Sequence, residues 1–108
     1  MATVYLDGRA ITDWPSFHRE CQLAFGFPDF YGHNMNAWID CLSYLRDDEG
    51  MTRFKLAADE ILQIEISHSD ALRGNMPDLL DELQECIAFI NDRYADYGEK
   101  PALTLLLR

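Results

Sequence analysis

The spacing of apolar residues changes along this 108-residue chain, and the changes limit the folds that it can adopt. Residues 3–6 are β-branched and aromatic, which favours a strand. Residues 62–66 alternate apolar with polar side chains, as expected of a strand with one buried face. Residues 102–107 are almost continuously apolar, which predicts a central strand buried on both faces.

Helical spacing of apolar residues occupies most of the sequence between these strands. The first helix is predicted to begin after a cap at Thr12 or Asp13 and to end at Gly26, where the apolar pattern stops. Asn34 is predicted to cap a second helix of about a dozen residues that runs toward Arg46, and a third, longer helix is predicted over 77–97. Residues 51–60 fit a loop or a short extra element, whereas residues 67–75 are polar and predict a turn.

The order of these elements predicts the fold class. Strands that alternate with helical connections are typical of α/β proteins, in which each connection crosses over to a parallel strand. A chain of 108 residues also suits one domain with a single core. We therefore expect one small domain over residues 1–108, built on a three-stranded parallel sheet with helical crossovers.

The charge of the chain narrows the classes of partner. There are 9 Lys and Arg residues against 19 Asp and Glu residues, which gives a formal net charge of −10. Binding to nucleic acid requires clustered cations that neutralise phosphates, and anionic membranes attract the same kind of surface. The excess of acidic residues therefore argues against direct nucleic-acid binding and membrane docking, and it favours a basic protein partner.

Sorting and redox features of the sequence predict a cytoplasmic protein. The first residues lack the basic and long apolar segments of a secretory signal, and no apolar run reaches the ~20 residues that span a bilayer. Cys21, Cys41 and Cys86 are odd in number and widely spaced, which predicts buried free thiols. The histidines lack the spacing of a metal site, so we expect no metal or other cofactor.

The predicted second helix has two contrasting sides. With a step of ~100° per residue, Asn36, Asp40, Ser43 and Asp47 fall within an arc of ~60°. The opposite side is apolar and carries Met35, Trp38, Ile39, Leu42 and Leu45. Such a polar side either contacts water, as most do, or forms a binding surface beside the aromatic residues of the preceding loop.

The residues around this helix also carry a family resemblance. Residues 27–42 read FPDFYGHNMNAWIDCL. The most specific part is the run Pro-acidic-aromatic-Tyr-Gly-x-Asn, which is followed by an Asp-Cys-Leu triplet. This stretch resembles the barstar family of ribonuclease inhibitors, and the short first strand and the final apolar strand resemble the ends of that family's chains.

The resemblance implies a fold, an activity and a set of contact residues. Barstar-like proteins are small α/β domains with a three-stranded parallel sheet that block the cationic active site of a basic, barnase-like ribonuclease. The loop and second helix enter the active site, and carboxylates replace the substrate's phosphates. The matching positions here are Phe30, Gly32, Asn34, Asn36, Ile39 and Asp40, and Tyr31, His33 and Ser43 complete the predicted partner-binding surface. Asp40 matches the family's principal phosphate-mimicking carboxylate.

Three positions depart from the family pattern. Asn36 stands where an aspartate is usual, Phe30 replaces a tyrosine, and Ile39 replaces a tryptophan. These changes remove a charge, a hydroxyl donor and contact area, and they point to a different cognate nuclease or to weaker binding. A further acidic contact of the family lies on the last helix, where Asp92 and Asp96 are the candidates.

The leading hypothesis is a non-enzymatic intracellular inhibitor of a basic ribonuclease, monomeric when free, with Asp40 as the phosphate mimic. A second hypothesis keeps the scaffold and changes the partner to another basic toxin or nuclease, for which the chain would act as an immunity or regulatory module. A third, an enzyme that uses a carboxylate pair with histidine, finds no support in the residue spacing.

Overall fold

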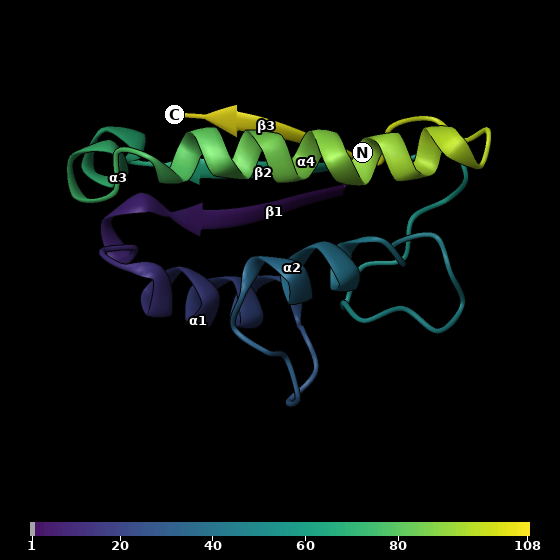
Figure 1. The fold of residues 1–108 in the computed structure, drawn as a ribbon, viewed down its shortest axis with the longest axis horizontal. Coiled ribbons are helices and arrows are strands. Elements are labelled where there is room, and N and C mark those ends of the chain that lie inside the picture. The colour runs from purple at the N-terminus through teal and green to yellow at the C-terminus, as the bar shows by residue number, and fades with distance from the viewer. Residues whose placement is uncertain (1) are drawn as a thin grey trace.

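The computed structural model describes residues 2–108 and contains one parallel sheet (Figure 1). Its strands are β1 (Ala2–Asp7), β2 (Leu62–Ser67) and β3 (Leu103–Leu107), in the spatial order β1-β2-β3. Both neighbouring pairs run parallel. The predicted three-stranded parallel sheet is therefore confirmed.

Helices form both connections between the strands (Figure 1). The elements of the first connection precede β2, and those of the second lie between β2 and β3. In chain order they are η1 (Gly8–Ala10), α1 (Trp14–Phe25), α2 (Met35–Leu42), α3 (Ser69–Asn75) and α4 (Leu79–Asp96). The predicted helical crossovers are confirmed, and residues 51–60 contain no helix or strand.

The helices cover one face of the sheet. Right-handed crossovers that advance in one direction across a parallel sheet place their helices on the same face. The burial of β2 shows this, because Leu62, Ile64 and Ile66 are fully buried and the side chains between them are only partly covered. On the open face, Tyr5 of β1 is mostly exposed.

The position predicted for the last strand is wrong. The apolar run at residues 102–107 was expected at the centre of the sheet, but β3 is an edge strand and β2 is central. Within β3 only Leu103 is buried, and the other residues are partly exposed. An edge strand over an open face can be apolar without being enclosed, so the composition of the run did not report its place in the sheet.

Local capping residues set the start of both helices in the first connection. The side chain of Asp13 accepts a hydrogen bond from the backbone of Ser16 at 2.9 Å, and the Ser16 hydroxyl accepts one from the backbone of Asp13 at 3.0 Å. Gly26 then ends α1 in the left-handed conformation at φ 72°. The side chain of Asn34 caps α2 by accepting from the Ala37 N–H at 2.8 Å. All three positions agree with the prediction.

The end of α2 differs from the prediction. The helix stops at Leu42 instead of continuing toward Arg46. The cause lies on α4: the Tyr94 hydroxyl accepts a hydrogen bond from the Leu45 N–H at 3.0 Å and donates to the Leu42 carbonyl at 3.3 Å. Tyr94 therefore pairs backbone groups that a continuing helix would have used itself.

A second difference concerns residues 67–75, which were expected to form a turn. Ser69–Asn75 instead form the short helix α3. Two tertiary contacts account for it: Leu72 is fully buried, and the backbone and hydroxyl of Ser69 both donate to the carbonyl of Arg108, at 3.0 Å and 2.8 Å. Tertiary packing thus outweighs the polar composition of the segment.

The core forms between the sheet and the helices. Its largest fully buried side chain is Trp38 of α2, which packs with the rings of Phe17 and Phe25 of α1. The cysteines are buried and free, as predicted, and burial raises the pKa of the Cys21 thiol to about 12. None of the helices in residues 2–108 is long and apolar enough to pass through a bilayer.

Candidate functional site

The loop between α1 and α2, residues 27–33, protrudes beyond both helices (Figure 1). Its base is formed by buried aromatic rings: Phe27 and Tyr31 lie with their ring centroids 4.6 Å apart. The Tyr31 hydroxyl shares a 2.6 Å hydrogen bond with Nδ1 of His18 on α1. Burial raises the pKa of Tyr31 and lowers the pKa of His18, so both groups are neutral at neutral pH. The buried rings and the Tyr31–His18 hydrogen bond therefore anchor the base of the loop to α1.

Tyr31 was predicted as part of the exposed surface, and the structure places it elsewhere. Its side chain is 5% exposed and faces His18. The neighbouring Phe30 is 77% exposed and presents its phenyl ring to solvent. The hydrogen bond to buried His18 accounts for the difference, and the sequence pattern alone did not fix which of the two rings points outward.

Polar contacts hold the outer part of the loop. His33 adopts the left-handed conformation, at φ 52°, and its Nε2 lies 3.0 Å from Oε1 of Gln22 on α1. The amide of Gln22 in turn donates to the carbonyl of Pro28 at 3.0 Å. At Gly32 a Cβ atom would lie 3.2 Å from the side chain of Asn34, which donates to the Gly32 carbonyl. Gly32, His33 and Asn34 are exposed.

The outer side of α2 continues this surface. Asn36 and Asp40 are exposed, and Ile39 beside them is half-buried. The side chain of Asp40 is 66% exposed. On the opposite side of the same helix Trp38 and Leu42 are fully buried, so the helix that carries Asp40 is fixed in the core. The predicted contrast between the two sides of α2 is confirmed.

The early end of α2 changes how the predicted polar residues are arranged. Ser43 caps the helix and remains near Asp40, and its hydroxyl donates to the Ile39 carbonyl at 2.7 Å. Asp47 lies beyond the helix, where it lines a groove between the end of α2 and the end of α4. Asn36, Asp40 and Ser43 thus share one surface, and Asp47 belongs to the adjacent groove.

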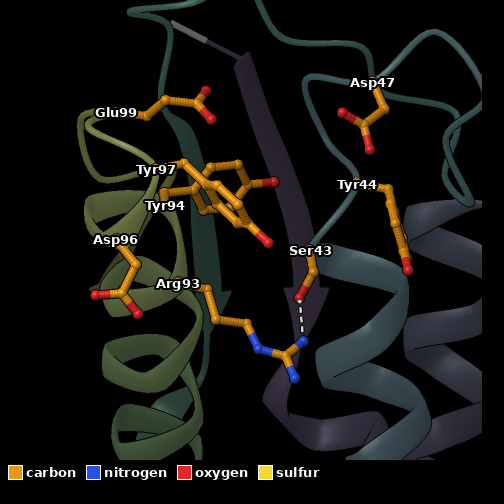
Figure 2. A pocket seen from close by; sticks show the side chains of 8 residues that line it. All are labelled: Ser43, Tyr44, Asp47, Arg93, Tyr94, Asp96, Tyr97 and Glu99. Carbon is orange, nitrogen blue, oxygen red and sulfur yellow. Dashed lines mark hydrogen bonds between the residues drawn. The ribbon is translucent and has the colours of Figure 1, made fainter.

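Figure 2 shows this groove, which has a volume of about 650 Å³. Its lining residues combine carboxylates, tyrosines and one arginine: Ser43, Tyr44, Asp47, Arg93, Tyr94, Asp96, Tyr97 and Glu99. Of the two acids considered on the last helix, Asp96 lines the groove. The acidic surface of α2 therefore extends toward the C-terminal end of α4.

Arg93 is a residue of this surface that sequence reasoning missed. Its guanidinium reaches from α4 to α2 and donates to the Ser43 hydroxyl at 3.1 Å (Figure 2). The same nitrogen, Nη1, lies 3.8 Å from Oδ1 of Asp40. The sequence signal that could have indicated Arg93 is that it is the only basic residue in the acidic helix α4. Its contact with Asp40 depends on the packing of α4 against α2, which spacing along the chain does not reveal.

Taken together, these residues make a surface suited to recognising a cationic partner. A carboxylate is an acceptor-only group that offers two oxygens to arginine or lysine donors. Here it stands on a helix fixed in the core, and the loop before that helix carries an exposed aromatic ring and exposed polar groups, a composition found in protein–protein interfaces. The fold and the site therefore define a small, acidic protein-recognition domain.

Comparison with known families agrees with this class. The sequence model of one family, described as Barstar (barnase inhibitor), matches residues 1–106 of the chain. The chain belongs to the barstar family. The predicted resemblance and fold class are thereby confirmed, and the family's description names a role in inhibition. No match was found among the curated proteins.

Proposed function

We propose that this protein inhibits a basic, barnase-like ribonuclease by placing the loop 27–33 and the outer side of α2 in its active site. Asp40 takes the position of a substrate phosphate and accepts hydrogen bonds from the nuclease's cationic side chains. The observation that carries this proposal is the 66% exposure of the Asp40 side chain on a helix fixed in the core through Trp38.

A fixed carboxylate is an effective substitute for a phosphate. Both groups are anionic acceptors that can receive two parallel N–H donors from one arginine. A helix that is already ordered loses little conformational entropy on binding, so more of the interaction energy appears as affinity. The net charge of −10 also accelerates the encounter with a positively charged protein.

The neighbouring residues suit the edge of such an interface. Phe30 presents an exposed ring on an anchored loop, and aromatic residues are frequent among the energetically dominant contacts. Asn36 supplies amide donors and acceptors, and Ile39 adds half-buried apolar area. Gly32, His33, Asn34 and Ser43 complete the surface, whereas Tyr31 supports it from inside.

In this proposal the protein acts by binding and carries out no catalysis, which agrees with the role printed for its family. We assign the activity to the cytoplasm, because three buried free cysteines suit a compartment that keeps thiols reduced. The inhibitor would be monomeric until it meets the nuclease.

Inhibition of RNA cleavage by barnase tests the proposal. The wild-type chain should inhibit with one molecule per nuclease, and Asp40→Ala should raise the dissociation constant at least ~30-fold, the size expected for a dominant contact. The range of affinity losses known for dominant contacts, from which this ~30-fold is taken, itself includes the barnase–barstar pair. Asp59→Ala is the matched control, because it removes an exposed carboxylate from the loop before β2. Thermal unfolding should be unchanged for both variants.

Two results would contradict the proposal. Equal inhibition by wild type and Asp40→Ala would remove Asp40 from the site. Failure of the wild type to inhibit barnase would favour the alternative, an immunity or regulatory module for a different basic toxin. The observation behind that alternative is the reduced charge and contact area of the surface, where Asn36 and Ile39 replace the residues usual in the family.

A further inference from the structure

The carboxylate of Asp40 already has a cationic neighbour within its own chain. Arg93 of α4 lies with Nη1 3.8 Å from Asp40 Oδ1 and donates from the same atom to Ser43 at 3.1 Å. Figure 2 shows its side chain extending from α4 toward the end of α2. The guanidinium that lies beside Asp40 thus belongs to a residue that also lines the groove.

This contact cancels the charge where the proposed function needs it. Asp40 is the only charged residue of α2, and its neighbours Asn36 and Ser43 are neutral. The local charge at Asp40 and Arg93 therefore sums to zero, although the whole chain carries −10. A cationic nuclease that approaches Asp40 also meets the like charge of Arg93, which opposes association.

From these contacts we infer that Arg93 is an internal competitor for Asp40 and sets the affinity and specificity of the site. The inference rests on the proposed function. In the free protein, the Arg93 guanidinium takes the position of a partner's arginine. It leaves that position when the partner binds. A nuclease binds well only if its own cations interact with Asp40 more strongly than Arg93 does.

The Arg93 contact is weak enough to be replaced. The Arg93 and Asp40 side chains are 44% and 66% exposed, so water screens the pair. The hydroxyl of Ser43 is a neutral acceptor, and it retains its bond to the Ile39 carbonyl at 2.7 Å without Arg93. Exposed ion pairs of this kind change an equilibrium constant by no more than a factor of about five.

The groove offers a position for the displaced side chain. Asp96 lies one helical turn after Arg93 on α4, at the spacing at which side chains of a helix meet, and it lines the same groove. Phe89, one turn before Arg93, lies 5.0 Å from the guanidinium and can keep its cation–π contact. Release of Asp40 therefore leaves Arg93 with a carboxylate and an aromatic ring nearby.

A double-mutant cycle with barnase tests this inference. Arg93→Ala should tighten binding by about threefold to tenfold, the sum of a released ion pair and a removed like charge. Arg73→Ala is the matched control for overall charge, because Arg73 is an exposed arginine on α3, at the other end of α4 (Figure 1). It should change the dissociation constant less than about twofold. Arg93→Lys retains the cation and should bind like the wild type.

The same cycle separates the inference from the proposed function. In the Asp40→Ala background, Arg93→Ala should give a smaller gain than in the wild-type background, because the contested carboxylate is absent and only the like charge is removed. Weaker binding by Arg93→Ala, or a gain equal to that of Arg73→Ala, would overturn the inference and leave the proposed function standing. Equal binding by wild type and Asp40→Ala, or no binding by the wild type, would overturn the proposed function and the inference together.

Discussion

Two arginines join the neighbourhood of α2 to the C-terminal part of the chain, and the structure holds them in different ways. The guanidinium of Arg46 donates to the carbonyls of Lys100 at 2.7 Å, Glu60 at 3.0 Å and Pro101 at 3.2 Å. Its side chain is only 6% exposed. We call this region the closed seam. The side chain of Arg93, in contrast, is 44% exposed, and its guanidinium makes a single hydrogen bond, to Ser43.

The two arginines separate contacts that stabilise the fold from contacts that a partner can replace. The Arg46 side chain is almost fully buried and donates to three backbone carbonyls at once, so the closed seam stabilises the fold. An exposed contact between side chains exchanges easily with water or with a partner. The region around Arg93 is therefore the one that can change its partner without unfolding the chain.

The largest expected effect on stability is that of Arg46→Ala. The variant leaves three carbonyls without their donor and should lower the free energy of unfolding by about 2–4 kcal/mol. Chemical denaturation followed by circular dichroism measures this. A loss below about 0.5 kcal/mol, the size typical of surface substitutions, would show that the seam is not closed in solution.

Tyr94→Phe should produce an intermediate loss. The ring remains in the core, but the Leu45 N–H and the Leu42 carbonyl lose the hydroxyl that joins them. We expect the free energy of unfolding to fall by about 1–2 kcal/mol, the cost of leaving buried backbone groups unpaired. An unchanged denaturation curve would contradict the role given to Tyr94 in ending α2.

The buried pair His18 and Tyr31, beneath the loop, makes the stability of the protein depend on pH. Burial lowers the pKa of His18 in the folded protein below the unfolded value of about 6.5. The unfolded chain therefore binds more protons, so this contribution to stability is complete above pH ~6.5 and is lost as the pH falls toward the folded pKa.

Thermal unfolding between about pH 5.5 and pH 7.5 should therefore show wild-type stability rising with pH. His18→Gln removes this titration, so its stability should depend less steeply on pH in the same window. Parallel pH profiles for the two proteins would mean that His18 titrates as in the unfolded chain, and that the base of the loop is open to water.

The smallest expected effect is that of Arg93→Ala on stability. Its contacts are exposed, so the free energy of unfolding should change by no more than about 0.5 kcal/mol. The same denaturation experiment compares it directly with Arg46→Ala. A loss as large as that of Arg46→Ala would erase the distinction between the two regions.

The parts of the fold set by local residues could be predicted from the sequence. Asp13 and Asn34 cap helices through their own side chains, and Gly26 ends α1 through its left-handed backbone. The alternation in β2 follows from its one buried face. The exposure of Asp40 opposite buried Trp38 follows from helical periodicity, so the central part of the site could be predicted as well.

The parts set by contacts between distant segments could not be predicted. The end of α2 depends on Tyr94, and the counterion of Asp40 is Arg93, both on a helix in the other half of the chain. The edge position of β3 depends on the order of the strands in the sheet, and an apolar run can occur in an edge strand as well as in a central one. Which of two adjacent aromatic residues is buried, Tyr31 rather than Phe30, depends on the position of His18.

In the proposed function, Asp40 occupies the phosphate position of a ribonuclease active site. Steady-state cleavage of an RNA substrate by barnase, at increasing concentrations of the protein, measures whether this position is occupied. Occupation of the substrate's own site predicts competitive inhibition, in which the apparent KM rises and kcat stays constant. A fall in kcat with an unchanged KM would place the protein outside the active site and contradict the account.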